Sequence, residues 1–342
     1  MSYSQLKSFI LRSFIILLVA YCFFGGAWLA CWFHAIPFQL GIEQDVSQEE
    51  SPAESITILH DIEYRKGASK QWRLDLAMKK DLKGKPRPGI VVIHGGGWVE
   101  GGRSSFASKK FGVPGNIEEF AELGFVAVTI NYRLSGEALF PAALEDCKCA
   151  VRWLRAHAKE YNLDPKQIGA YGNSAGGHLA MLLGMVGKEA GIEGDGPYPE
   201  ESSTVQAVLS DSGPIDMVYQ YEHSAIKTVV GKFMGGAPEG ERTALYKKAS
   251  PLHQIGKDVP PLLLIYGVAD GQIPIETADQ FVLALGRAGH QDVSYYRLAY
   301  VDHCPYSLVR VESLKPIVND FFIRTLMHPE TARQIKRRVD VK

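Results

Sequence analysis

Polar and apolar residues divide this chain into an apolar amino-terminal stretch and a longer region of alternating strand-like and helix-like segments. Apolar runs of about four to eight residues indicate buried strands, whereas longer runs with apolar positions at helical spacing indicate helices. The predicted strands are 55–64, 71–78, 90–93, 126–130, 168–171, 205–209, 261–267 and 293–298. The predicted helices are 117–123, 142–161, 177–183 and 277–286. This order favours an α/β fold in which helices cover both faces of a mostly parallel central sheet.

The amino-terminal stretch has the features of an export signal. Residues 13–42 contain no Asp, Glu, Lys or Arg, and their centre, 14–24, is typical of the hydrophobic region of a signal peptide. At about 20 apolar residues the stretch is also long enough to span a bilayer. We therefore interpret 1–40 as a signal peptide or a membrane anchor, and the sequence leaves both open. Basic residues before it and an acidic linker at 41–55 predict that the rest of the chain is exported, as a secreted or periplasmic protein or one anchored outside the cytoplasm.

Two glycine-rich segments carry the strongest chemical signal. Residues 172–177 read G-N-S-A-G-G between a predicted strand and a predicted helix. The small neighbours allow a sharp turn that lifts the Ser174 hydroxyl above the sheet. Alone, such a turn could instead bind phosphate. Residues 94–98, H-G-G-G-W after an earlier strand, favour a nucleophilic serine, because consecutive glycines bring backbone N–H groups close to a developing oxyanion at ~3 kcal/mol for one donor.

A nucleophilic serine needs a base, and the base needs an orienting carboxylate. On this arrangement of elements the order along the chain is Ser, Asp or Glu, then His. Asp270 follows the predicted strand 261–267, and His303 follows the predicted strand 293–298. We assign His303 as the base and Asp270 as its partner.

Other acids and histidines are weaker candidates. Asp302 is adjacent to the predicted base, so its side chain should diverge from the ring. Asp211 and Asp216 follow a predicted strand and stand as reserve acids. His94 is expected to support the glycine loop by hydrogen bonding, and His178 to point along its helix away from the serine.

Together these segments resemble the α/β-hydrolase superfamily, specifically the hormone-sensitive-lipase-like and the acetylxylan- and feruloyl-esterase-like carboxylesterases. The resemblance covers nearly all of 56–327, and its motifs are 94–98, 172–177, A-D-G-Q-I-P at 269–274, and His303. The catalytic residues that it implies are Ser174, Asp270 and His303. The implied oxyanion donors are the N–H groups of Gly96, Gly97 and Ala175. The resemblance implies no cofactor and no catalytic metal.

The expected activity is hydrolysis of carboxylic esters through an acyl-enzyme intermediate on Ser174. The variable regions are polar, which favours short acyl chains over long ones. By analogy with esterases of this resemblance, an exported location fits acetyl or feruloyl esters of plant polysaccharide. Two alternatives stay open: an amide-cleaving relative such as a formamidase or serine peptidase, and a non-catalytic receptor on the same fold.

Composition narrows the partners. With 37 basic and 38 acidic residues the formal net charge is −1, which gives no reason to expect nucleic acid. Cys147 and Cys149 lie two apart on a predicted helix and face different directions, so they do not form a zinc site. Cys304 is the third cysteine outside 1–40, and whether it is bridged stays open. The expected partner is a small-molecule or polysaccharide ester, with membrane contact only through the amino terminus. Residues 56–327 form the catalytic domain, followed by a basic tail, 328–342.

Overall fold

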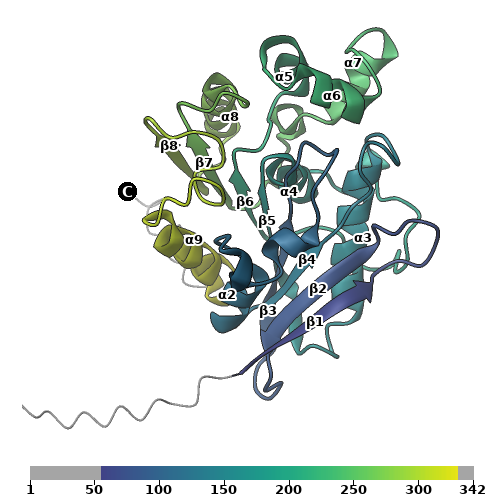
Figure 1. Cartoon of the computed structure of the whole chain (residues 1–342), viewed down its shortest axis with the longest axis vertical. Coiled ribbons are helices and arrows are strands. Elements are labelled where there is room, and N and C mark those ends of the chain that lie inside the picture. Colours follow the sequence, from purple (N-terminus) through teal and green to yellow (C-terminus); the bar gives the residue numbers. More distant parts are fainter. Residues whose placement is uncertain (1–54, 330–342) are drawn as a thin grey trace, which may run out of the picture. The chain divides into compact units, whose positions relative to one another are not determined.

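The computed structural model describes residues 55–329, and an eight-stranded sheet runs through them (Figure 1). The strands are β1 (Ile56–Glu63), β2 (Arg73–Lys79), β3 (Arg87–Ile93), β4 (Val126–Ile130), β5 (Leu163–Asn173), β6 (Ala207–Asp211), β7 (Leu262–Gly267) and β8 (Val293–Leu298). They are ordered β1-β2-β4-β3-β5-β6-β7-β8. The β1/β2 and β2/β4 pairs are antiparallel, and all later pairs are parallel, which confirms the predicted mostly parallel sheet.

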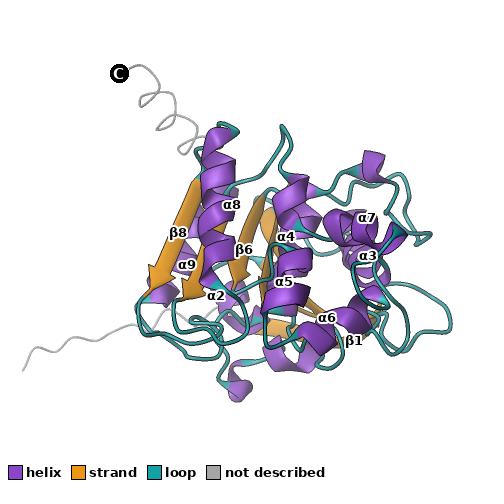
Figure 2. Ribbon diagram, turned by 90° about the horizontal axis from the view of Figure 1, so that it is seen from above, coloured by secondary structure: helices purple, strands orange, loops and turns teal. Residues whose placement is uncertain are grey.

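Helices cover both faces of this sheet (Figures 1 and 2). The α-helices are α2 (Ile117–Glu122), α3 (Ala142–Ala156), α4 (Ala175–Met185), α5 (Met217–His223), α6 (Lys227–Met234), α7 (Glu241–Lys248), α8 (Ile275–Arg287) and α9 (Leu314–Phe322). Short helical turns add η2 (Arg103–Phe106), η3 (Lys109–Phe111), η4 (Lys188–Ala190), η5 (Pro251–Gln254) and η6 (Ile323–Met327). Helices α5 to α7 form the insertion between β6 and β7.

Alternation along β3 shows why its sequence is continuously apolar. Ile90 and Val92 belong to the core under α2 and α9, whereas Val91 and Ile93 belong to the core under α3, α4 and α8. All four side chains are fully buried. Because successive side chains on a strand point to opposite faces, a sheet covered on both faces buries every position of its central strands. The carboxyl ends of the parallel strands then meet along one edge, where their loops form the site.

One predicted helix is longer than the observed one. The helix expected over 142–161 ends at Ala156, because the chain tightens after that residue. The Ala158 N–H donates to the carbonyl oxygen of Arg155, three residues earlier. The His157 ring nitrogen Nδ1 lies 2.8 Å from the Trp153 carbonyl oxygen. The chain then turns at Asn162, at φ 50°, and enters β5.

Several sequence predictions fall outside the described residues. The signal peptide or anchor at 1–40, almost all of the acidic linker and almost all of the basic tail lie there. Over 55–329, no helix is both long and apolar enough to cross a bilayer, and no cluster of three or more His, Cys, Asp or Glu is arranged to hold a metal. The three cysteines of this range are buried free thiols, and Cys147 and Cys149 pack into the core.

Candidate active site

Ser174 occupies a sharp turn between β5 and α4. Its φ of 52° and ψ of −123° are unfavourable for a residue that carries a Cβ atom. The Ser174 N–H donates to the Asp211 carbonyl oxygen at 2.7 Å, which ties the turn to β6. Glycine is required beside it: a Cβ atom on Gly176 would lie 2.0 Å from the Ile93 carbonyl oxygen, and one on Gly172 would lie 2.2 Å from Gly176. This close packing holds the strained serine in place.

His303 and Asp270 are joined by a hydrogen bond of 2.7 Å between Nδ1 and Oδ2. The other carboxylate oxygen accepts the N–H groups of Gln272 and Ile273, at 2.8 and 2.9 Å. Burial alone would raise the pKa of Asp270, but the hydrogen bond and charge interaction with His303 and these two N–H groups lower its pKa below the usual value. A charged carboxylate at Nδ1 favours the proton on that nitrogen and leaves Nε2 free to accept one.

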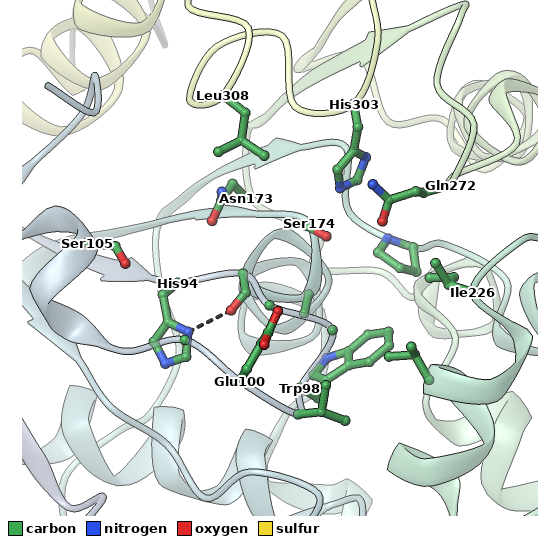
Figure 3. Close-up of a pocket in the computed structure, with 18 of the residues that line it drawn as sticks. His94, Trp98, Glu100, Ser105, Asn173, Ser174, Ile226, Gln272, His303 and Leu308 are labelled. Carbon is green, nitrogen blue, oxygen red and sulfur yellow. Dashed lines mark hydrogen bonds between the residues drawn. The ribbon is translucent and has the colours of Figure 1, made fainter. Parts of the chain in front are cut away.

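Ser174 and His303 line the same pocket, which has a volume of about 530 Å³. In Figure 3 the His303 ring extends from its loop toward the Ser174 hydroxyl, and Gln272 lies beside it. Within residues 55–329 no hydrogen bond joins the hydroxyl to the ring; such contacts often tighten only when substrate binds. The structure therefore brings together the three side chains that the sequence places on separate loops.

The glycine loop after β3 offers free backbone donors to this pocket. Gly96 and Gly97 have φ of +102° and +59°, and the N–H groups of Val99 and Glu100 both close a tight turn onto the Gly96 carbonyl oxygen at 3.1 Å. The N–H groups of Gly96, Gly97 and Ala175 donate no hydrogen bond within the described part of the chain. All three residues line the pocket, so these donors can serve an oxyanion.

Comparisons with known proteins agree with this geometry. Residues 74–285 match the BD-FAE family, which is more than half of the chain. The chain belongs to the BD-FAE family. Esterase LipC of Mycobacterium tuberculosis is 30% identical over 237 residues, which cover 67% of this chain and 56% of that protein. The resemblance to α/β-hydrolase carboxylesterases of the hormone-sensitive-lipase-like type is thereby confirmed.

Two solved structures are similar to this BD-FAE chain. A bifunctional GH43-CE protein of Bacteroides eggerthii has a TM-score of 0.67 and 31% identity, and the match covers 78% of this chain and 38% of that one. A truncated carbohydrate esterase from gut microbiota has a TM-score of 0.66 and 25% identity, covering 80% of this chain and 98% of that one. The fold is therefore that of an α/β-hydrolase. The chain spans between 50% and 61% of the length of the first three curated relatives.

The two histidines near the elbow of this BD-FAE protein have structural roles. The His94 ring stacks on Tyr132 with 4.3 Å between centroids, and its Nδ1 lies 2.7 Å from the Gly95 carbonyl oxygen. His178 Nε2 lies 2.7 Å from the Ala249 carbonyl oxygen, so the ring is directed away from the serine, as expected. Burial lowers the pKa of each ring to about 4, so both stay neutral and support the loops around them.

Two of the alternative acids bind backbone groups instead of the base. The Asp302 carboxylate accepts the N–H of His303 itself, at 2.7 Å. Asp216 accepts the N–H groups of Val218 and Tyr219 at 3.0 and 3.1 Å and caps the start of α5. Neither carboxylate has a hydrogen bond to the His303 ring, whereas Asp270 has one.

Asp211 has a role that the sequence did not reveal. Its fully buried carboxylate accepts the Ser307 N–H at 2.8 Å, the Ser307 hydroxyl at 2.7 Å and the Tyr306 N–H at 3.2 Å. Burial raises its pKa to about 6, although these hydrogen bonds oppose the shift. Since its carbonyl oxygen also receives the Ser174 N–H, one residue connects the serine turn to the loop that carries His303.

The pocket of this BD-FAE protein differs on the two sides of Ser174. Figure 3 shows Ser105 and Asn173 on one side and Trp98 and Ile226 on the other. Trp98 and Ile226 give the second side a largely apolar lining, although the buried Trp98 indole N–H has no hydrogen-bond partner within residues 55–329, and Leu308 adds an apolar side chain beside Asn173 on the first side (Figure 3).

Proposed function

We propose that this protein is a serine carboxylesterase in which Ser174 is the nucleophile, His303 the base and Asp270 its orienting acid. The observation that carries the proposal is the 2.7 Å bond from Asp270 to His303, in a pocket that also holds the strained serine. The relatives named above are an esterase and carbohydrate esterases, which supports cleavage of esters over amides and over a receptor role.

The reaction follows from the geometry. Ser174 Oγ attacks the carbonyl carbon of the ester while His303 Nε2 takes the hydroxyl proton. The carbonyl oxygen becomes negative beside the N–H groups of Gly96, Gly97 and Ala175, where one donor supplies about 3 kcal/mol. His303 then gives the proton to the departing alcohol. Water, activated by the same ring, attacks the acyl-enzyme and releases the acid.

The substrate proposed is a short acyl ester, with acetyl or feruloyl esters of plant polysaccharide as the natural class. A pocket of about 530 Å³ with one mainly apolar side supports a short acyl group more than a long one. Initial rates on p-nitrophenyl acetate, butyrate, octanoate and palmitate, with acetylated xylan and a feruloylated arabinoxylan in parallel, test this proposal. A preference for the octanoate or palmitate would contradict it.

The catalytic assignment is tested with Ser174→Ala. We expect kcat on p-nitrophenyl acetate to fall by about 10⁴-fold or more, and labelling by a fluorophosphonate probe to disappear. Ser202→Ala is the matched control, because Ser202 is in the loop before β6 and does not line the pocket; its activity should equal that of the unmodified protein. If Ser174→Ala retained most of the hydrolysis, the proposal that Ser174 is the nucleophile would be wrong.

We also propose that the catalytic domain works outside the cytoplasm. Support comes only from the sequence of 1–40 and its flanks, with a charge-free apolar stretch between basic and acidic residues. Fractionation of cells that produce the full chain tests the location. Amino-terminal sequencing of the mature protein distinguishes a cleaved signal peptide from a retained anchor.

A further inference from the structure

Asn173, the residue before the serine, has a buried amide that lacks a partner. Its side chain lines the pocket and is 6% exposed, and its Oδ1 accepts no hydrogen bond within residues 55–329. A buried polar atom without a partner lowers stability. Because Asn173 lines the pocket, a group bound there can approach its amide.

The position of this amide is fixed by its surroundings. Asn173 is the last residue of β5 and pairs in register with Asp211 on β6. A Cβ atom on Gly95 would lie 3.1 Å from Asn173 Oδ1 and 3.2 Å from Ser174 Cβ, so the amide and the nucleophile lie against the same glycine. A group bound by Asn173 must then be next to the reacting ester.

The two sides of the pocket distinguish the two substituents of an ester. Trp98 and Ile226 lie on the side away from Asn173 (Figure 3). A short acyl chain is apolar and matches that side. The alcohol part then extends over Asn173, with Ser105 as a second polar neighbour and Leu308 as an apolar one on the same side (Figure 3).

We propose that Asn173 recognises a free hydroxyl on the alcohol part of the substrate, next to the esterified oxygen. A hydroxyl both donates and accepts, so it satisfies either end of the amide. The substrates favoured are monoesters of diols, polyols and sugars, in which the carbon beside the acylated one carries a free hydroxyl. A plain alkyl ester leaves the amide unpaired and is disfavoured. This inference rests on the proposed esterase function and specifies its substrate class.

The test uses two esters of the same size. 2-Hydroxyethyl acetate and propyl acetate differ by a hydroxyl in place of a methyl group. The ratio of their kcat/KM values, corrected for their rates of alkaline hydrolysis, should be about tenfold in favour of the hydroxylated ester. Asn173→Leu should bring the ratio close to one. Asn173→Ala serves the same purpose if the leucine variant does not fold, and fluorophosphonate labelling of Ser174 shows that either variant retains a working site.

Gln272→Leu is the matched control, because Gln272 is another amide of the pocket and lies beside His303 (Figure 3). It should leave the ratio as in the unmodified protein. If the ratio of kcat/KM values for the two acetates is the same in the unmodified protein and in Asn173→Leu, only water satisfies the amide. This result would overturn the inference. A second pair, ethyl glycolate and ethyl propionate, carries the hydroxyl on the acyl part. If Asn173→Leu changes only the ratio for ethyl glycolate and ethyl propionate, Asn173 binds the acyl part of the substrate and the inference is wrong.

These outcomes are separate from a failure of the esterase proposal. In that case the unmodified protein would hydrolyse neither acetate and would not react with the fluorophosphonate probe. Both proposals would then be rejected.

Discussion

Asp211→Asn tests whether one buried carboxylate joins the serine turn to the histidine loop. The variant keeps the size of the side chain and the carbonyl oxygen that receives the Ser174 N–H. It has one acceptor oxygen in place of two, so an amide NH₂ group faces a backbone N–H of Tyr306 or Ser307. The loop after His303 is then held less firmly. We expect kcat on p-nitrophenyl acetate to fall by about 10- to 100-fold, because small misplacements of a catalytic group are costly.

The effect on stability depends on pH. Burial raises the pKa of Asp211 to about 6, from 3.8. Between these pH values the unfolded chain has released a proton that the folded chain still holds, so the unmodified protein loses stability as pH rises. At about 1.4 kcal/mol per pKa unit, the loss is about 3 kcal/mol. The Asn variant does not titrate at this position. It should be less stable at pH 4, by about 1–3 kcal/mol for the unpaired N–H, and equally or more stable at pH 7.

Urea unfolding followed by tryptophan fluorescence at pH 4, 5, 6 and 7 measures the free energy of unfolding of both proteins. The quantity of interest is their difference, because other groups contribute equally to each. Ser307→Ala is the control: it removes one hydrogen bond to the carboxylate but leaves the titrating group, so the fall with pH should remain. A difference between Asp211→Asn and the unmodified protein that stays constant from pH 4 to pH 7 would refute the argument.

Three further substitutions test the site and its support. Asp270→Asn should lower kcat by about 10⁴-fold without unfolding the protein, because the amide cannot hold the required tautomer of the base; steady-state kinetics and circular dichroism measure both. Gly96→Ala should lower kcat by about 10²- to 10³-fold, since a Cβ atom there would lie 2.2 Å from the Glu100 carbonyl oxygen and displace an oxyanion donor; unchanged kcat would exclude this loop from the oxyanion hole. Gly176→Ala should lower the free energy of unfolding by more than about 3 kcal/mol in a urea titration, because its new Cβ atom would lie 2.0 Å from the Ile93 carbonyl oxygen, whereas a stable variant would contradict the tight packing of the elbow.

The sequence predicted the parts of the site that depend on local patterns. Glycines within two positions indicate Ser174, and the ends of apolar strands indicate Asp270 and His303. The structure brings Ser174 and His303 into one pocket and joins Asp270 to His303. The fold followed from the same alternation of apolar runs, because a sheet covered on both faces requires it. Each of these signals lies within about ten residues of the position that it identifies.

What the sequence did not reveal depends on contacts between distant residues. Asp211 and Ser307 are separated by 96 positions, and no local pattern connects them. Asp211 therefore looked like a reserve acid, although the structure directs its carboxylate into the histidine loop. The unpaired amide of Asn173 was also invisible, because a missing partner is known only once all neighbours are in place. The end of α3 at Ala156 was missed for a local reason, since no Gly or Pro marks it.

The order of the strands has a consequence for synthesis of the protein. The strand that ends at the nucleophile, β5, pairs on one side with β3, which is made earlier, and on the other with β6, which is made later. Until residues 207–211 have been synthesised, the backbone N–H and C=O groups on the β6 side of β5 have no hydrogen-bonding partner from their own sheet. Such an edge invites pairing with other chains. Emerging chains halted before this point should therefore be prone to aggregation and should depend on chaperones.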